Sequence, residues 1–225
     1  MNPLRAARLI ALVAFLAGCG GGPPPADWKL NAVSQLETAQ NDWLEGNTPA
    51  AEAALASMRG EIARSGRTDL LARAELAACA ARVASLDFAA CAGYEKLAAD
   101  ASPADAAYAR FLAGEWSELD AKALPAHYRP LVGAQNDASA NKAVAGIEDP
   151  LPRLIGAALL FRQTRAEPAT LAQAVETASE RGWRRPLLAW LEVSLRRARS
   201  AGDAEAAAII QRRLDLVTQG ARGQR

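Results

Sequence analysis

The stretch Asp27–Pro49, DWKLNAVSQLETAQNDWLEGNTP, predicts the fold class of the whole chain. Its large apolar residues recur at helical spacing along one predicted helix, from about residue 27 to 45: Leu30, Val33, Leu36, Trp43 and Leu44. Gly46 ends this helix, and Thr48-Pro49 supplies an N-cap and a first-turn proline for a second helix that ends near Gly66. Two helices joined by so short a break predict an antiparallel helix hairpin.

Similar helix boundaries recur along the rest of the chain. Aromatic residues make up only 5% of it, and no segment shows the sustained apolar–polar alternation of a strand. Further helices are predicted at about Asp69–Ser85 and Phe88–Asp100, and others start at Ser102-Pro103, Asp149-Pro150, Pro168, Pro186 and Asp203. The chain is therefore expected to be all-α, with roughly nine or ten helices and short connections.

Helix pairs recur at intervals of roughly 34 to 42 residues, which indicates a helical-repeat array. Three stretches resemble the tetratricopeptide repeat family: Trp43-Leu44-Glu45-Gly46-Asn47, Phe111-Leu112-Ala113-Gly114-Glu115-Trp116 and Leu195–Ala207. The resemblance is partial, and it implies a solenoid of antiparallel helix hairpins. A generic alanine-rich helical array is the alternative.

The N-terminus carries a separate signal. Met1–Arg8 contains two basic residues and no acid, and Leu9–Ala17 is an uninterrupted apolar run. This order is typical of a secretory signal peptide, and the apolar run is too short to span a bilayer as a helix. The next residues, Leu16-Ala17-Gly18-Cys19, resemble the lipobox of bacterial lipoproteins at every position.

The lipobox resemblance implies that residues 1–18 are removed by cleavage between Gly18 and Cys19, and that Cys19 then carries a covalent lipid. Gly20 stands where the retention rule of this family looks for Asp, which implies the outer membrane, with the body in the periplasm of the cell envelope. Three glycines and three prolines follow Cys19, so residues 19–26 are predicted to form a lipidated tether. An ordinary secreted protein with a chance cysteine is the alternative.

Charge and composition divide the predicted mature chain. Residues 19–150 hold 11 basic and 18 acidic side chains, whereas residues 151–225 hold 13 basic and 7 acidic ones. Two prolines, Pro125 and Pro130, and a polar stretch after them interrupt the helical pattern near the middle. We predict an N-terminal helical-repeat module at 27–124, a hinge region at 125–148, a C-terminal helical module at 149–219 and a disordered tail at 220–225.

Apart from Cys19, the chain has two cysteines, Cys79 and Cys91. An even pair in an exported chain favours a disulfide, and a short turn between two antiparallel helices brings the two residues near each other. Cys91 is predicted to begin the second of these helices, about one turn away from the ideal position. Two buried thiols among alanines are the alternative.

The sequence contains no GxSxG, HExxH or CxxC motif, and it has a single histidine. His127 lies between two prolines and is interpreted as a loop residue. Carboxylate pairs such as Glu148 and Asp149 are interpreted as acids at helix ends. We therefore expect no catalytic residue, no metal site, no cofactor apart from the lipid on Cys19, and no enzymatic activity.

Arginines concentrate near the C-terminus and form a candidate patch for an anionic partner: Arg181, Arg184, Arg185, Arg196, Arg197 and Arg199. Its ligand would be a lipopolysaccharide phosphate, a peptidoglycan carboxylate or an acidic protein, because nucleic acid is implausible in this compartment. A solvated set of helix faces is the alternative. Trp183 and Trp190 share a helical stripe, which indicates core packing, with an aromatic-lined groove as the other interpretation.

These observations lead to three hypotheses about function. The first is a helical-repeat scaffold or adaptor at the outer membrane, held there by its lipid anchor, that binds a protein partner in the envelope. The second is a carrier of a lipid or amphiphile, and the third is a cell-wall hydrolase that acts through carboxylates. The sequence favours the first hypothesis.

Overall fold

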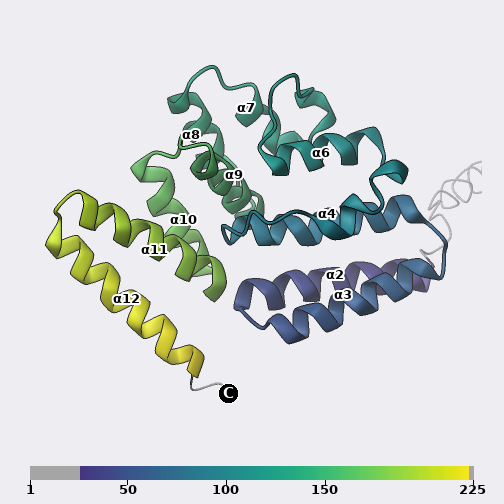
Figure 1. Cartoon of the computed structure of the whole chain (residues 1–225), viewed down its shortest axis with the longest axis horizontal. Helices are drawn as coiled ribbons and strands as arrows, with labels where there is room; N and C mark the ends of the chain where they lie inside the picture. Colours follow the sequence, from purple (N-terminus) through teal and green to yellow (C-terminus); the bar gives the residue numbers. More distant parts are fainter. Residues whose placement is uncertain (1–25, 223–225) are drawn as a thin grey trace, which may run out of the picture.

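A computed structural model describes residues 26–222, which form eleven α-helices, three short 3-10 helices and no strand (Figure 1). The predicted all-α class is confirmed. The predicted signal peptide, Cys19 and the tether up to residue 25 lie outside the described residues, and so do residues 223–225. No helix within the described range is both long and apolar enough to cross a membrane.

The first two helices, α2 (Asp27–Glu45) and α3 (Thr48–Ala63), form the predicted antiparallel hairpin. Gly46 ends α2 with φ at +90°, a left-handed conformation that glycine adopts without the steric cost of a side chain. Pro49 lies in the first turn of α3, where its missing N–H costs no hydrogen bond. Asn47, and not Thr48, is the N-cap residue.

The predicted apolar face of α2 is wrong in its first half. Leu30 and Val33 are each 55% exposed, whereas Ala32 and Ala39 are buried. Ala32 shares a small core cluster with Met58 and other residues of α3 and α4. The neighbouring helices therefore approach α2 along its alanines, which allow closer contact than leucine or valine would.

The predicted helix from Phe88 to Asp100 is also wrong in part. After α4 (Thr68–Ala84), residues 88–91 are not helical, and only two short helices follow, α5 (Ala92–Glu95) and η1 (Ala98–Asp100). Because this segment leaves helical geometry, Cys91 reaches Cys79 on α4, and the two form a disulfide with a Cα–Cα distance of 5.8 Å. The disulfide prediction is confirmed. Cys91 does not lie one helical turn out of position, as the predicted helix implied, because residues 88–91 are not helical.

The disulfide is expected to stabilise the fold, since it closes a loop of 12 residues. Replacing both Cys79 and Cys91 with serine should lower the free energy of unfolding by about 3 kcal/mol, mainly because the unfolded chain regains conformational freedom. Urea denaturation of the oxidised protein, the reduced protein and the double variant measures this loss. An equal midpoint for all three would contradict the expectation.

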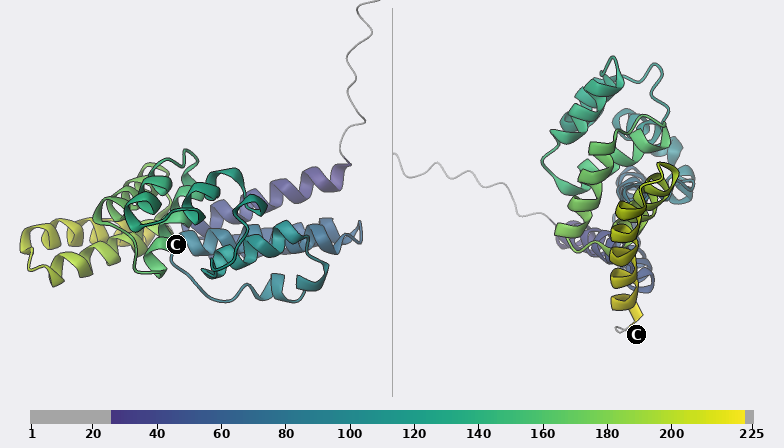
Figure 2. Two further views of the ribbon diagram at one scale, coloured as in Figure 1. Left: turned by 90° about the horizontal axis from the view of Figure 1, so that it is seen from above. Right: turned by 90° about the vertical axis from the view of Figure 1, so that its left-hand side faces the viewer.

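The remaining elements complete a curved array of helices (Figures 1 and 2). In chain order they are α6 (Pro103–Ala113), η2 (Ala121–Ala123), η3 (Ala126–Tyr128), α7 (Arg129–Val132), α8 (Asp137–Ala145), α9 (Pro150–Arg162), α10 (Pro168–Glu180), α11 (Arg184–Ser200) and α12 (Ala204–Arg222). Residues 125–148, predicted as a hinge, thus contain η3, α7 and α8, and α12 continues beyond the predicted module end at residue 219. The helices α11 and α12 form a second hairpin at the end of the molecule opposite the α3–α4 turn.

Helices far apart in the sequence are joined by direct contacts. Helix α4 packs against α9, and α2 packs against α11. At the second contact Arg185 donates hydrogen bonds to the Trp43 carbonyl at 2.7 Å and to Thr48 Oγ1 at 2.6 Å, and its guanidinium lies 3.9 Å from the centre of the Trp43 ring. An open solenoid has contacts only between adjacent repeats, so these contacts fold the array back on itself.

The main core is continuous across the predicted modules. One cluster of buried residues extends from Leu44 on α2 to Leu214 on α12 and includes Leu131 and Val144 from the predicted hinge. Trp190 belongs to this cluster and is fully buried, and its Nε1 donates to the Ala84 carbonyl at 3.2 Å. The interpretation of the tryptophan stripe as core packing is confirmed.

Candidate functional site

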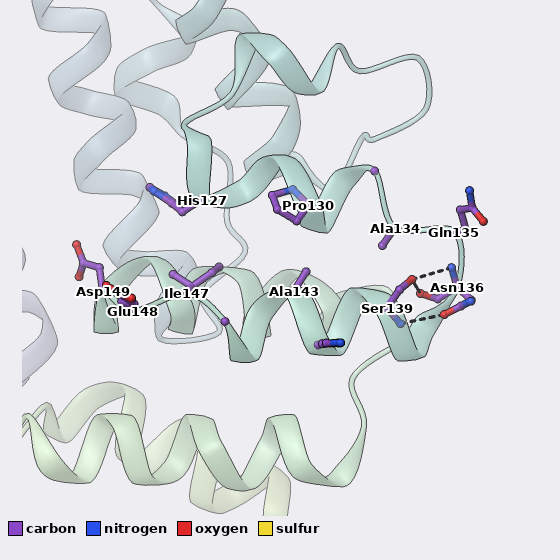
Figure 3. Close-up of a pocket in the computed structure, with 13 residues that line it drawn as sticks. His127, Pro130, Ala134, Gln135, Asn136, Ser139, Ala143, Ile147, Glu148 and Asp149 are labelled. Carbon is purple, nitrogen blue, oxygen red and sulfur yellow. Dashed lines mark hydrogen bonds between the residues drawn. The ribbon is translucent and has the colours of Figure 1, made fainter.

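A surface hollow lies between α7 and α8, and we call it the α7–α8 groove (Figure 3). It has a volume of about 920 Å³, within the range of small-ligand and peptide sites. Residues from η3, α7, α8 and the loop before α9 line it: His127, Pro130, Gly133, Ala134, Gln135, Asn136, Ser139, Lys142, Ala143, Gly146, Ile147, Glu148 and Asp149. The groove therefore lies in the region predicted as a hinge.

The chemistry of the α7–α8 groove changes along its length. Pro130 and Ala143 lie near its middle, whereas Ile147 lies toward the His127 end (Figure 3). The glycines and alanines of the lining leave room for another backbone to lie close. One end carries His127, Glu148 and Asp149, and the other end carries polar residues of the α8 N-terminus (Figure 3). Lys142 is exposed on α8 between the two ends.

Asn141 fastens α8 to the helices behind the groove. Its side chain is buried, and its Nδ2 donates to the carbonyls of Asp137 and Arg165 at 2.8 and 2.9 Å. Its Oδ1 accepts from the Glu167 N–H at 2.9 Å and from the Thr170 hydroxyl at 2.6 Å. All four hydrogen-bonding positions of the amide are thus used, which is the condition for a buried polar group to stabilise a fold.

Further contacts hold both ends of α8. At its start, Asn136 and Ser139 form a reciprocal capping box, with the Ser139 N–H donating to Asn136 Oδ1 at 2.9 Å. After its end, Arg153 on α9 donates to the carbonyls of Ile147 and Glu148 at 2.7 and 3.0 Å. The walls of the groove are therefore positioned before any ligand arrives.

A glycine lets α9 approach the back of the groove. A Cβ on Gly156 would lie 3.2 Å from Val144 Cγ2 and 3.4 Å from Leu131 Cδ2. Since Val144 belongs to α8 and Leu131 to α7, the missing side chain allows both groove helices to pack on α9.

His127 and Asp149 interact at one end of the α7–α8 groove. His127 is exposed, but partial desolvation of its ring lowers its pKa from the usual value of 6.5, and the negative charge of Asp149 opposes this shift. Asp149 is also the N-cap of α9 and accepts from the Leu151 N–H at 3.3 Å. At neutral pH this end of the groove therefore combines a neutral imidazole with two carboxylates.

The titration of His127 provides a direct test of this geometry. We expect an NMR titration midpoint below 6.5, since desolvation penalises the protonated ring. Asp149→Asn should lower the midpoint further, because the substitution keeps the helix cap but removes the favourable charge. Glu37→Gln, on the distant helix α2, serves as the control and should leave the midpoint unchanged. A midpoint that rises in Asp149→Asn would contradict this account.

The arrangement is suited to binding. A neutral ring and two carboxylates can accept hydrogen bonds or pair with a cation, Lys142 can pair with an anion, and the middle can contact apolar groups. An extended peptide with a basic residue at the His127 end has this combination of groups. Among the described residues there is no group of three or more His, Cys, Asp or Glu side chains that could hold a metal ion.

The structure divides the candidate arginine patch into two groups on α11. Arg184 and Arg185 lie at its N-terminal end and line a hollow of about 880 Å³ beside the α2–α3 turn, where Arg185 already binds Trp43 and Thr48. Arg181, just before α11, lies 5.4 Å from the centre of the Trp183 ring. Arg181 and Arg185 therefore make contacts within the protein.

The second group lies near the C-terminal end of α11, roughly 16 to 22 Å along the helix from Arg184 and Arg185. Arg196, Arg197 and Arg199 are exposed there. Arg199 donates to Gln211 at 3.1 Å, and Arg197 lines a smaller hollow between α10, α11 and α12. The six arginines thus do not form one continuous surface.

Sequence reasoning missed the α7–α8 groove as a site. The spacing of Asn136 and Ser139 resembles a capping box and could have located the start of α8. Nothing local marks Asn141, whose partners Arg165, Glu167 and Thr170 follow 24 to 29 residues later. No family model, no curated protein and no solved structure matches this chain.

Proposed function

We propose that this chain is an outer-membrane lipoprotein whose body acts in the periplasm as a helical scaffold or adaptor for another envelope protein. Cys19 carries the lipid, and a segment of the partner binds in the α7–α8 groove. The observation that supports binding is the groove itself, about 920 Å³ in volume and built on helices held by Asn141 and Arg153. Binding sites that exist before the ligand arrives avoid the entropic cost of ordering their own walls.

The partner that fits best is an extended segment with a basic residue or a free amine. Glu148 and Asp149 would pair with that charge, and the small residues of the groove would contact its backbone. The proposed role requires neither a cofactor nor catalysis. We propose a relation to tetratricopeptide repeats only for the hairpins α2–α3 and α11–α12. The array as a whole differs from an open solenoid of such repeats, because α2 contacts α11.

Anchoring is tested separately from binding. Cells that express the full chain are fed an alkyne fatty acid, and the labelled protein is followed in membrane fractions. The wild type should be labelled and sediment with outer membranes, whereas Cys19→Ala should be unlabelled and retain the signal peptide. Labelling that persists in Cys19→Ala would rule out the proposed anchor site.

Binding is tested by placing a photoreactive amino acid in the groove. Position 134 or 143 should crosslink reproducibly to one envelope protein, whereas position 208, exposed on α12, should not. Ala143→Leu, which fills the groove with an apolar side chain, should remove the crosslink from position 134 without changing the unfolding temperature. Equal crosslinking at positions 134 and 208 would contradict a role for the groove.

A further inference from the structure

The described residues expose few large apolar side chains. Four stand out: Leu30 and Val33 near the start of α2, and Ile209 and Leu216 on α12. Leu30 and Val33 are one helical turn apart and are each 55% exposed. They lie in the first two turns of α2, immediately after the segment that leads to Cys19.

The length of that segment limits where α2 can lie. Seven residue steps separate Cys19 from Ala26, and a fully extended chain of this length spans about 24 Å. If Cys19 is held in a bilayer, the start of α2 therefore stays within about 24 Å of the bilayer surface. The α3–α4 turn lies at the same end of the molecule, whereas the α11–α12 hairpin lies at the other end (Figure 1).

The charges at this end neither attract nor repel an anionic surface strongly. Three basic and three acidic residues belong to the first turn of α2 and the region of the α3–α4 turn: Lys29, Arg64, Arg67, Asp27, Glu61 and Asp69. Two ion pairs, Arg64–Glu61 and Arg67–Asp69, neutralise most of these charges locally. Contact with a bilayer would therefore depend on the exposed apolar side chains of Leu30 and Val33.

On these grounds we propose that the first two turns of α2, through Leu30 and Val33, rest on the surface of the phospholipid bilayer that holds the anchor. This inference rests on the proposed lipidation of Cys19 and extends it by assigning the surface of the body that meets the membrane. In this orientation the α11–α12 hairpin points away from the bilayer.

A bilayer fits this surface better than a second copy of the chain. A stable protein interface buries about 800 Å² on each partner, far more than two side chains one turn apart provide. A tethered surface, in contrast, needs only a weak contact, because the anchor raises its effective concentration into the millimolar range or above. The short segment between Cys19 and α2 keeps Leu30 and Val33 close to the bilayer, and it does not raise the effective concentration of a second copy of the chain.

The test uses the whole mature chain, with a phospholipid attached to Cys19 by chemical coupling. Cys19 is coupled to a maleimide phospholipid in vesicles of phosphatidylethanolamine and phosphatidylglycerol, while Cys79 and Cys91 remain in their disulfide. A photoreactive leucine analogue replaces Leu30 or Val33, and Ile209 or Leu216 provides the matched exposed control. Mass spectrometry should find roughly tenfold more phospholipid adducts at positions 30 and 33 than at 209 and 216.

Two further measurements complete the experiment. Hydrogen exchange at the start of α2 should slow when the chain is tethered, and Leu30→Ser with Val33→Ser should abolish the slowing, whereas Ile209→Ser with Leu216→Ser should retain it. The adduct yield should change little with salt or phosphatidylglycerol content. Equal yields of phospholipid adducts at the α2 positions and the α12 positions would overturn the inference, and so would adducts between protein chains. Since the anchor is attached chemically in this experiment, a failure of the membrane contact is distinguishable from a failure to acylate Cys19 in cells, which the fatty-acid labelling measures.

Discussion

Replacing Trp190 with alanine is expected to lower the free energy of unfolding by about 4 kcal/mol. The indole is fully buried in the main core and lies edge-on to Phe161, with ring centres 5.8 Å apart. Its Nε1 also donates to the Ala84 carbonyl, which joins α11 to the end of α4. The substitution therefore removes apolar contacts, leaves a cavity and leaves a buried carbonyl without its donor.

Urea denaturation monitored by circular dichroism measures this effect. Trp190→Phe retains most of the ring volume and loses the hydrogen bond, so it should cost less than Trp190→Ala. Leu216→Ala, at a position that is 72% exposed, is the control and should change stability very little. If Trp190→Ala unfolds at the same urea concentration as Leu216→Ala, the main core does not depend on this residue.

The second large effect is expected at Asn141. Asn141→Ala leaves the buried Thr170 hydroxyl and the partly buried Glu167 N–H and Arg165 carbonyl without their partner. An unsatisfied group costs roughly 1 to 3 kcal/mol when it is fully buried and less when water can reach it. We expect a total loss of about 4 kcal/mol in the free energy of unfolding. Because Asn141 holds α8, the variant should also crosslink less from position 143 in the α7–α8 groove.

A double-variant cycle separates this network from a general loss of packing. Thr170→Val removes one hydrogen bond and should cost about 1 kcal/mol. Asn141→Ala combined with Thr170→Val should cost less than the sum of the two single changes, because Thr170 no longer presents an unpaired hydroxyl. Asn31→Ala, at an exposed position on α2, is the control for removing an asparagine. Strict additivity would mean that Asn141 and Thr170 do not act together.

Most helix boundaries could be predicted because their causes are local. Gly46 ends α2, and Ser102 caps α6 by accepting from the Asp105 N–H three residues later. Such signals act over one helical turn and can be recognised without knowledge of the fold. Where a boundary depends on a distant residue, prediction failed, as at residues 88–91, which leave the helix so that Cys91 can reach Cys79.

The buried face of a helix could not be predicted in the same way. On α2 the apolar pattern favoured Leu30 and Val33, but the neighbouring helices cover Ala32 and Ala39. In an alanine-rich chain several faces of a helix are apolar enough to be buried, and the contact with α3 and α4 decides among them. The contacts of the candidate arginines depend on the fold for a related reason, since Arg185 donates to the carbonyl of Trp43, which precedes it by 142 residues.

The sequence by itself determined the all-α class, the first and last hairpins and the cysteine pair, because helix periodicity, caps and short turns act between residues close in the chain. Only the tertiary structure decided which faces are buried, how the array closes through α2–α11 and α4–α9, and that residues 127–149 form a groove. The groove has its shape because Asn141 and Gly156 join α8 to α9 and α10, and contacts of this kind depend on positions in space that no local pattern specifies.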